Sequence, residues 1–568
     1  MKTACIALAS LSLCSTAALA TAQTSLQTST GGSAGDQLGD AIAVLGDLDG
    51  DGQAELAVGA PFADVNGASS GLVRVLNGRT GAIVRSFAGP VAGDRLGESV
   101  ACAGDVDGDG WNDLVAGAPN HDTNGSNAGM ARVWSGRTGS VLFTWHGDAA
   151  GDWFGLSVDG AGDVNGDGRM DVIVGAPYGK GTNTANVGEA RIFSGLDGSV
   201  LRTFNSPQGV SVLGMSVSGA GDVDRDGFAD VLVGAPQSTY SLNDQGRVWV
   251  FSGRTGAALR FFQGSTAGEN FGFCVDGGRD VNNDGWPDFV IGSPFADYQG
   301  ANSGSVFVHS GLDGAQLFHF RGTAASDDMG RSCAHAGDVD GDGWGDVIGG
   351  ARLKDQGLGN CGMARVWSGR TGAVLHSVYG ASVDEMLGHA VAGGADVNGD
   401  GLDDFVVGWP TFDSGATSID VGRARAYSAA PLPVTSYGTA GTSASGCTAT
   451  LTTSGSPSAS ALTPFIVRAN GVVRQSTGFL FYGSHGQAAP YGSGWLCVKS
   501  PFVRLVAQGT QGSATGAVCS GFVQQDLNAH FRSGPDLAVQ AGDTLFCQVF
   551  YRDGGSSLSN AVLFTIQP

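Results

Sequence analysis

One acidic nine-residue motif occurs seven times in this chain of 568 residues, and its spacing constrains the fold more than any other feature. The motif reads Asp-x-Asp/Asn-x-Asp-Gly-x-x-Asp/Glu, and successive copies begin 58 or 59 residues apart. A fixed period indicates a repeat architecture, in which each repeat is one supersecondary unit packed against the next. The copies begin at Asp47, Asp105, Asp163, Asp222, Asp280, Asp338 and Asp396.

Each repeat has the same four parts around this motif. A Leu-Gly or Phe-Gly pair precedes a short alternating strand, and the acidic loop then leads into an apolar run that ends in Gly-Ala-Pro or a related triplet. A polar loop leads to a third strand, and a Gly-Arg-Thr-Gly or Gly-Leu-Asp-Gly turn leads to a fourth. Four strands joined by turns, repeated seven times, predict an all-β chain with a seven-bladed β-propeller.

The two ends of the repeat region predict how the ring closes. The seventh repeat stops after its third strand at Tyr427 and has no fourth strand of its own. Near the N-terminus, residues 25–29 stand where fourth strands stand relative to the next repeat. We therefore expect this N-terminal strand to complete the last blade and remove an open sheet edge.

The acidic loops predict calcium sites. Oxygens at positions 1, 3 and 5 of a tight loop converge on one centre, position 7 adds a backbone carbonyl, and position 9 adds a carboxylate that is able to bind in bidentate fashion. Glycine at position 6 permits the sharp turn and is present in all seven copies. An EF-hand is excluded because its closing Glu stands at position 12 between helices. The predicted ligands are Asp47, Asp49, Asp51, Gln53, Glu55; Asp105, Asp107, Asp109, Trp111, Asp113; Asp163, Asn165, Asp167, Arg169, Asp171; Asp222, Asp224, Asp226, Phe228, Asp230; Asp280, Asn282, Asp284, Trp286, Asp288; Asp338, Asp340, Asp342, Trp344, Asp346; and Asp396, Asn398, Asp400, Leu402, Asp404.

The seven predicted sites are not equivalent. Position 3 is the neutral Asn165, Asn282 or Asn398 in loops three, five and seven, which we expect to bind calcium more weakly. Arg225 stands where five copies have glycine, so loop four is the least regular in sequence. The alternative is that each Asp-Gly pair only forms a polar turn. Seven copies in register favour up to seven structural Ca²⁺ ions instead.

By these motifs the chain resembles the FG-GAP repeat family, whose best-known members are the propeller heads of integrin α subunits. The resemblance covers residues 24–429 and rests on the recurring order of Phe-Gly, calcium loop and Gly-Ala-Pro. It departs where Gly350-Ala351-Arg352 and Gly408-Trp409-Pro410 replace the last triplet, and where Leu-Gly or Met-Gly replaces Phe-Gly. Every repeat carries the loop, whereas integrin heads carry it in only some blades. The chain therefore resembles secreted bacterial versions more than an integrin subunit.

The strong negative charge has a local source. The formal net charge is −23, and 25 carboxylates stand at positions 1, 3, 5 and 9 of the loops. Seven divalent cations would reduce the charge to about −9. This acidity makes nucleic acid an unsuitable partner, and after the N-terminal segment no stretch is apolar enough to span a membrane.

The N-terminal segment, residues 1–22, reads as a signal peptide with Lys2 before an apolar run. We therefore expect a secreted or cell-surface protein, in which cysteines are able to form disulfide bonds. Cys333 and Cys361 fall within one repeat and are candidates for pairing, while Cys102 and Cys274 read as small buried apolar residues. Four further cysteines near the C-terminus allow three connectivities: Cys447, Cys497, Cys519 and Cys547.

The remainder of the chain has a different composition. The propeller is predicted to span residues 23–429, and a Ser/Thr/Gly-rich linker follows over residues 430–460. Strand-like apolar runs then predict a small all-β, sandwich-like C-terminal domain over residues 461–568. Its role and the oligomeric state are not readable from the sequence.

No catalytic constellation is recognisable in the sequence. The Gly-x-Ser-x-Gly string at residues 67–71 lies in an inter-strand loop with no following helix, so the nucleophile-elbow geometry is absent. We expect a non-catalytic module that binds an extracellular protein or glycan through the loops opposite the calcium edge, as the resemblance to integrin heads implies. Two alternatives stay open: an extracellular hydrolase or lyase acting on glycans or phospholipids, and a structural cell-surface component.

Overall fold

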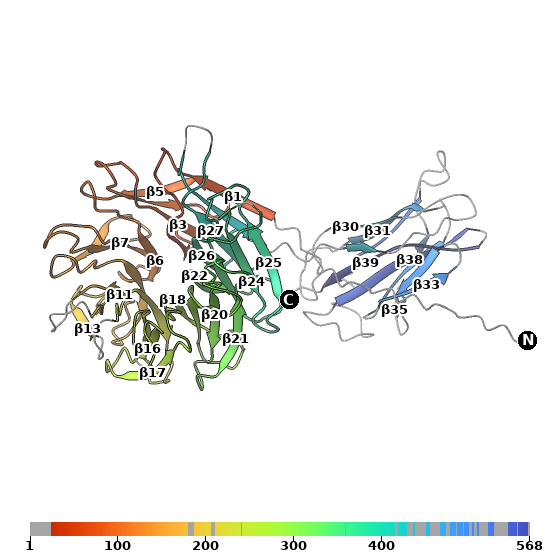
Figure 1. The fold of residues 1–568 in the computed structure, drawn as a ribbon. Coiled ribbons are helices and arrows are strands. Elements are labelled where there is room, and N and C mark those ends of the chain that lie inside the picture. Colours follow the sequence, from red (N-terminus) through yellow and green to blue (C-terminus); the bar gives the residue numbers. More distant parts are fainter. Residues whose placement is uncertain are drawn as a thin grey trace, which may run out of the picture.

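The computed structural model describes residues 24–179, 187–205, 211–239, 241–357, 359–414 and 419–428, and the backbone of strands between residues 435 and 565. The first of these parts, up to residue 428, forms seven four-stranded antiparallel sheets arranged around an axis (Figure 1). The predicted seven-bladed β-propeller is confirmed.

The strands recur in the order that the repeat predicts. The first strands are β2 (Ile42–Gly46), β6 (Ser99–Gly104), β10 (Ser157–Gly162), β14 (Ser216–Gly221), β18 (Cys274–Arg279), β22 (Ser332–Gly337) and β26 (Ala390–Ala395). The second strands are β3 (Glu55–Ala60), β7 (Asp113–Ala118), β11 (Asp171–Ala176), β15 (Asp230–Ala235), β19 (Asp288–Ser293), β23 (Asp346–Ala351) and β27 (Asp404–Trp409).

The outer half of each sheet completes the pattern. The third strands are β4 (Leu72–Leu76), β8 (Met130–Trp134), β12 (Glu189–Phe193), β16 (Arg247–Phe251), β20 (Ser305–His309), β24 (Met363–Trp367) and β28 (Arg423–Ser428). The fourth strands are β5 (Ile83–Ala88), β9 (Val141–His146), β13 (Val200–Asn205), β17 (Ala258–Gln263), β21 (Gln316–Arg321), β25 (Val374–Tyr379) and, for the last blade, β1 (Thr24–Thr30).

The N-terminal strand closes the ring, as the sequence predicts. Strand β1 pairs antiparallel with β28, with Thr28 opposite Arg425, and the Arg425 Nε donates a hydrogen bond of 2.8 Å to the Thr28 Oγ1. The last sheet therefore has the order β1-β28-β27-β26 and joins the two ends of the propeller. The first strands contact one another around the whole ring, so that β26 lies beside β2.

The core lies between neighbouring blades. All seven second strands are buried along their full length, which explains why they read as continuous apolar runs. Their glycine permits close contact: a β-carbon on Gly59 would collide with the backbone carbonyl of Gly97 in the next blade. The same contact joins Gly408 of the last blade to Gly39 of the first. The glycines of the Phe-Gly and Gly-Ala-Pro motifs therefore mark the interface between blades.

Beyond the propeller the structure describes only strand backbones. They are β29 (Thr435–Tyr437), β30 (Thr450–Ser454), β31 (Ile466–Val472), β32 (Thr477–Gly483), β33 (Gly486–Tyr491), β34 (Gly494–Val498), β35 (Val503–Arg504), β36 (Gln508–Gly509), β37 (Gly521–Asp526), β38 (Thr544–Asp553) and β39 (Gly555–Thr565). The sandwich-like domain over residues 461–568 stays a prediction. The signal peptide lies outside the described residues, and the linker does so apart from β29 and β30.

The cysteine prediction for the propeller is wrong in two respects, the disulfide bond and the burial of Cys102 and Cys274. Cys333 and Cys361 are free, buried thiols and form no disulfide bond. Cys102 and Cys274 are also free and are partly exposed, because they face the axis of the ring. Among the described residues, no helix is long and apolar enough to cross a membrane.

Candidate metal centres

All seven acidic loops connect a first strand to a second strand, so they lie on one face of the propeller. In loop one the motif begins directly after β2 and its position 9, Glu55, is the first residue of β3. The same holds in every blade, because the period of the motif equals the period of the blades. We call this side of the ring the acidic face.

Two hydrogen bonds fix each loop in the same conformation. The backbone N–H of the position-6 glycine donates to the position-1 carboxylate at 2.7–3.0 Å in all seven loops. The backbone N–H of position 2 donates to the position-9 carboxylate at 2.6–2.9 Å, also in all seven. Both ends of the loop therefore aim a carboxylate inward.

The position-9 carboxylates are fully buried. Each of the seven has 0% relative exposure. In blades two to six the second carboxylate oxygen accepts a hydrogen bond of 2.9–3.1 Å from the first glycine of the turn between the third and fourth strands. The position-9 residue therefore joins the acidic loop to the outer half of its blade, a role that the sequence motif alone does not indicate.

Burial changes the protonation of these acids. It raises the pKa of Glu55 to about 7, and with the nearby loop aspartates it raises that of Asp346 to about 8. Burial likewise raises the pKa of Asp404 to about 8. A buried carboxylate surrounded by others is unfavourable in its ionised form unless a cation compensates the charge.

In four loops the structure brings three acids together. Their carboxylate oxygens at positions 1, 3 and 9 lie within 4.8 Å of one another, in clusters that we call the acidic clusters. They are Asp47, Asp49 and Glu55; Asp105, Asp107 and Asp113; Asp222, Asp224 and Asp230; and Asp338, Asp340 and Asp346. These are the four loops with Asp at position 3.

In the other three loops position 3 is an amide. In loop seven the Asn398 Nδ2 donates to Asp400 at 3.0 Å and to Asp404 at 3.3 Å. The amide therefore lies among the carboxylates, and rotating it by 180° would present its oxygen to the same centre. These loops have the same backbone with one negative charge fewer.

The side chains at positions 5 and 7 lie outside the acidic clusters, which are formed by positions 1, 3 and 9. Position-5 aspartates are not members of the four acidic clusters. Two of them face an arginine of the adjoining turn: Asp226 lies 3.8 Å from Arg254, and Asp342 lies 3.9 Å from Arg370. Position-7 side chains extend to the neighbouring loop. A β-carbon on Gly50 would lie 3.2 Å from the ring of Trp111.

Contacts between loops extend around the ring. The backbone N–H of Ala54 in loop one donates to the carbonyl of Asp396 in loop seven at 3.3 Å. The equivalent bond joins Met170 to Asp105 at 3.2 Å and Ala229 to Asp163 at 3.0 Å. Each such bond fixes the position-1 residue of one loop to the next blade. The acidic face is therefore a connected ring rather than seven separate turns.

Loop four keeps this geometry despite its irregular sequence. Position 4 has a positive φ in all seven loops, and Arg225 adopts it with φ 59°. Its guanidinium carbon lies 3.2 Å from the ring centroid of Trp286 in loop five, and its Nη2 donates to the carbonyl of Gly285 at 2.8 Å. This stacking offsets the strain that a left-handed conformation imposes on a residue with a β-carbon.

The motif did not indicate one further polar residue of loop one. The Asn77 Nδ2 donates to Asp51 at 3.0 Å and to Asp49 and Glu55 at 3.2 Å. The signal was present in the alignment of repeats, because residue 77 is Asn where blades two to six have Ser before the turn glycine. Loop one therefore contains a neutral donor among its acids that those blades do not have.

The electrostatics of the acidic clusters fit a divalent cation. Two carboxylates about 4 Å apart repel each other by roughly 1–4 kcal/mol, depending on exposure. None of the four acidic clusters contains His or Cys, and an all-oxygen donor set is what a hard cation prefers. The residues present therefore fit Ca²⁺ better than zinc.

Two families of repeats match parts of the chain. The FG-GAP repeat family matches residues 38–76, 213–251 and 271–309. A second family, described as FG-GAP-like repeat, matches residues 62–174. Each of the three FG-GAP matches begins at the residue before the glycine of a Leu-Gly or Phe-Gly pair and ends with a third strand.

Curated relatives of the chain are integrin α subunits. Integrin alpha-V of Gallus gallus is 32% identical over 213 residues, which is 35% of this chain and 20% of that protein. Integrin alpha-5 of Xenopus laevis is 28% identical over 230 residues, or 38% of this chain and 21% of that protein. Integrin alpha-IIb of Mus musculus is 33% identical over 221 residues. The matches span about a fifth of the length of these relatives.

Proposed function

The chain is an FG-GAP repeat protein related to the N-terminal β-propeller of integrin α subunits, and from this we propose that it is a secreted, calcium-stabilised, non-catalytic module for ligand binding or adhesion. The observation that carries the calcium part is the convergence of carboxylates at positions 1, 3 and 9 in four loops. We propose calcium in the other three loops as well, because they share the same hydrogen-bonded backbone.

Calcium has a structural role in this proposal. A cation bound among the carboxylates offsets their repulsion and favours the ionised form of the buried position-9 acid. With a dissociation constant of ~10⁻⁴ M and ~1 mM calcium, each site contributes about 1.4 kcal/mol. Seven such sites contribute roughly 10 kcal/mol, which is comparable to the whole stability of an ordinary domain.

The opposite face of the ring is the candidate ligand face. There the loops between second and third strands lie beside those that connect one blade to the next. Several aromatic side chains on this face have polar or aromatic neighbours: Trp153 packs edge-on against Tyr178 at 5.1 Å, and Arg95 lies 4.5 Å from the ring of Phe62. Such side chains are typical of surfaces that bind proteins or sugars.

The calcium part is tested by metal titration. Calcium binding to chelator-treated protein is measured by isothermal titration calorimetry, and we expect saturation at more than one ion per chain. Loops with Asp at position 3 should fill before those with Asn, because they carry one more negative charge. Heat changes no larger than those of dilution would contradict the proposal.

The ligand part is tested by an array of extracellular-matrix proteins and glycans, probed with and without calcium. We expect binding that needs calcium and that is reduced by substitution on the ligand face, for example Tyr178→Ala. The matched control is an alanine substitution of the exposed Leu196, which lies in a turn on the acidic face. Turnover of a glycan or phospholipid on the same array would favour the hydrolase or lyase alternative.

A further inference from the structure

The first strands surround a cavity on the axis of the ring. Its polar lining residues are different from those of the acidic clusters. A cavity of about 560 Å³ is lined by first-strand residues of all seven blades. A second cavity of about 250 Å³ lies toward the candidate ligand face. The two cavities share lining residues, namely Ile42, Val100, Val158, Cys274, Cys333 and Val391. The two cavities therefore adjoin along the axis, and we call them together the axial channel.

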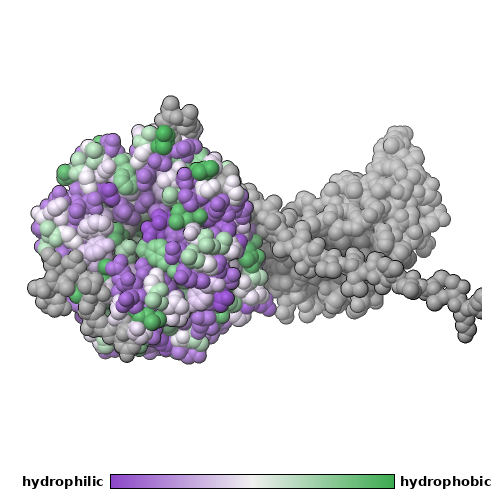
Figure 2. Space-filling view, viewed as in Figure 1, coloured by the Kyte–Doolittle hydropathy of each residue, from purple (hydrophilic) through white to green (hydrophobic). Residues whose placement is uncertain are grey.

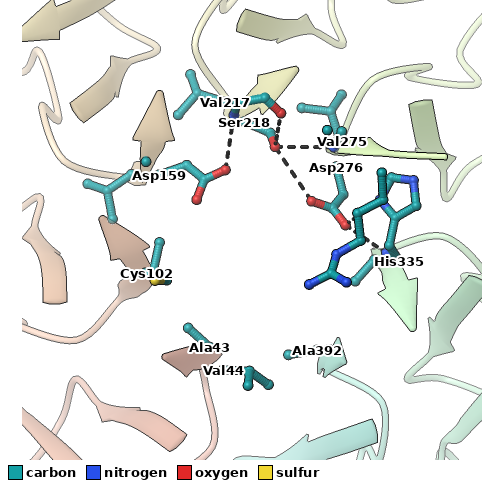
Figure 3. A pocket seen from close by; sticks show the side chains of 18 of the residues that line it. Ala43, Val44, Cys102, Asp159, Val217, Ser218, Val275, Asp276, His335 and Ala392 are labelled. Atoms are coloured by element: carbon teal, nitrogen blue, oxygen red, sulfur yellow. Dashed lines mark hydrogen bonds and ion pairs between the residues drawn. The ribbon is translucent and has the colours of Figure 1, made fainter. Parts of the chain in front are cut away.

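The wall of the inner cavity has a polar side and an apolar side (Figure 3). The carboxylates of Asp159 and Asp276 lie on either side of Ser218. The Asp159 Oδ2 accepts from the backbone N–H of Gly219 at 3.1 Å, and the Asp276 Oδ1 lies 3.5 Å from the Ser218 Oγ. The opposite wall includes Ala43, Val44, Cys102 and Ala392.

The two carboxylates of the cavity are held differently. The Asp276 Oδ2 accepts from the backbone N–H of His335 at 2.7 Å and from its ring Nδ1 at 2.9 Å. Charge and hydrogen bonds from His335, despite burial, hold the pKa of Asp276 below its usual value. Among the residues that the structure describes, Asp159 has no cationic partner, and burial together with the charge of Asp276 raises its pKa to about 7. Asp159 is the group whose charge is left uncompensated.

Arg279 lines the acidic-face end of the cavity and already makes a hydrogen bond there. The Arg279 Nη2 donates to the carbonyl of Gly394 at 2.9 Å, which joins β18 to β26 across the axis. A β-carbon on Gly394 would lie 2.7 Å from the guanidinium carbon. Arg279 therefore links the fifth blade to the seventh at the acidic-face end of the cavity.

The opening at the ligand face also has an apolar side and an ionisable side. One residue per blade lines it, directly after the glycine of the Phe-Gly, Leu-Gly or Met-Gly pair. We call this set the mouth ring: Asp40, Glu98, Leu156, Met215, Phe273, Arg331 and His389. The apolar members come from three consecutive blades, and the ionisable members come from the other four. An amphipathic molecule therefore finds matching sides at the opening.

Two polar atoms of the mouth ring lack a partner. Glu98 Oε2 and His389 Nδ1 are buried and form no hydrogen bond to any residue that the structure describes. Burial raises the pKa of Glu98 and, with the charge of Glu98, raises that of Asp40 to about 7, whereas burial lowers that of His389 to about 3. Arg331 lies 4.3 Å from the ring of Phe273. The opening therefore holds two acids that lie near the positive charge of Arg331, and its unpartnered atoms are one carboxylate oxygen and one imidazole nitrogen.

We propose that the axial channel binds a small organic cation with an apolar portion, of the alkylammonium class. Its charge lies beside Asp159 and Asp276, and its apolar part lies along the wall of Ala43 and Val44. The cavity volume is within the usual range for small-molecule sites, and the net negative charge, which stays at about −9 with seven Ca²⁺ ions bound, attracts cations and repels anions. A metal ion is a poorer fit, because among the described residues the groupings of three close acids are confined to the loops.

The test uses the calcium-loaded full chain and n-butylammonium as the probe, with n-butanol and butyrate as neutral and anionic controls. We expect n-butylammonium to bind saturably by calorimetry or ligand-observed NMR, and both controls to bind at least about tenfold more weakly. Asp159→Asn and Asp276→Asn, made separately, should each weaken probe binding about tenfold. The matched control Asp313→Asn removes a charge from an exposed turn and should leave it unchanged.

A second measurement needs no variant. The cation favours ionised Asp159, so its affinity should rise by up to about tenfold from pH 6 to pH 8, while the amine stays protonated. The other titratable groups facing Asp159 are Asp276, His335, Arg279 and Cys102. No detectable probe binding, equal binding of butyrate, or unaltered binding by both Asn variants would overturn the proposal. None of these outcomes bears on calcium in the acidic loops.

Discussion

The residues at the two ends of the seven first strands differ in how well they are repeated from blade to blade. At the acidic face, positions 1, 5 and 6 of the loop are Asp, Asp and Gly in all seven copies. At the opposite end, the mouth ring has seven different residues in seven repeats. Both sets flank the same strands at the same period, so their difference reflects what each end does.

The acidic face repeats because its residues satisfy the backbone. Each position-1 and position-9 carboxylate accepts N–H groups that would otherwise be unpaired, and every loop needs the same bonds. The recurring hydrogen bonds of the mouth ring come from its backbone N–H groups and not from its side chains, so the side chains are free to differ. Figure 2 shows a corresponding mosaic of hydrophilic and hydrophobic residues on the face of the propeller in view. Repetition therefore marks structural residues, and variation marks candidates for specificity.

Removal of metal gives the largest expected effect. Chelation should lower the melting temperature of the propeller by about 10 °C or more, because the acidic clusters lose their counter-charge. Differential scanning calorimetry in EDTA and in about 1–2 mM calcium measures the two melting temperatures. An unchanged melting temperature would show that the acidic face is stable without metal.

Loss of one position-9 acid is the next largest effect. Asp113→Ala should destabilise the propeller by about 3 kcal/mol, because it leaves the N–H groups of Val106 and Gly136 unpaired in a buried site. Denaturant unfolding measures it in both calcium and EDTA. Asp109→Ala at position 5 is the control, and its cost in EDTA should stay below about 1 kcal/mol because its acid lies outside the cluster.

The pH dependence without metal has a definite sign. The folded pKa values of Glu55, Asp346 and Asp404 are raised above their unfolded values, so the folded state binds more protons between pH 4 and 8. The stability of the metal-free propeller should therefore fall as pH rises through this window. Melting curves in EDTA at pH 5, 6, 7 and 8 measure it, and calcium should flatten the trend. A rise in stability with pH would contradict the assigned burial.

Substitution of Arg225 gives a smaller effect. Arg225→Ala should cost about 1–2 kcal/mol, because it removes the stacking on Trp286 and keeps a β-carbon at a positive φ. Arg225→Gly should cost about 1 kcal/mol less, because glycine adopts this conformation without strain. Urea unfolding of both variants measures the difference, and equal costs would show that the backbone conformation is not strained.

The smallest expected effect lies in the mouth ring. Met215→Ser should change the free energy of unfolding by less than about 0.5 kcal/mol, because the side chain is half-buried and makes no recurring contact. The same denaturant experiment measures it. A cost as large as that of Asp113→Ala would mean that the mouth ring also supports the fold.

Much of this architecture was predictable from the chain alone. The period of the loops gave the number of blades, and the missing fourth strand after Tyr427 gave the closure by β1. The identity of position 3 separated the four loops that form carboxylate clusters from the three with an amide. These predictions hold because each depends only on the pattern of a single repeat or on the number and completeness of its copies, and both can be read along the chain.

The contacts between residues of different repeats could be known only from the closed ring. The free state of Cys333 and Cys361, the stacking of Arg225 on Trp286 and the position of Asn77 among the loop acids depend on packing within or between blades. The axial cavity with Asp159 and Asp276 exists only when first strands from seven blades surround one axis. Spacing along the chain specifies each blade, but closing the ring determines which side chains share a small volume, and that sets their burial and charge.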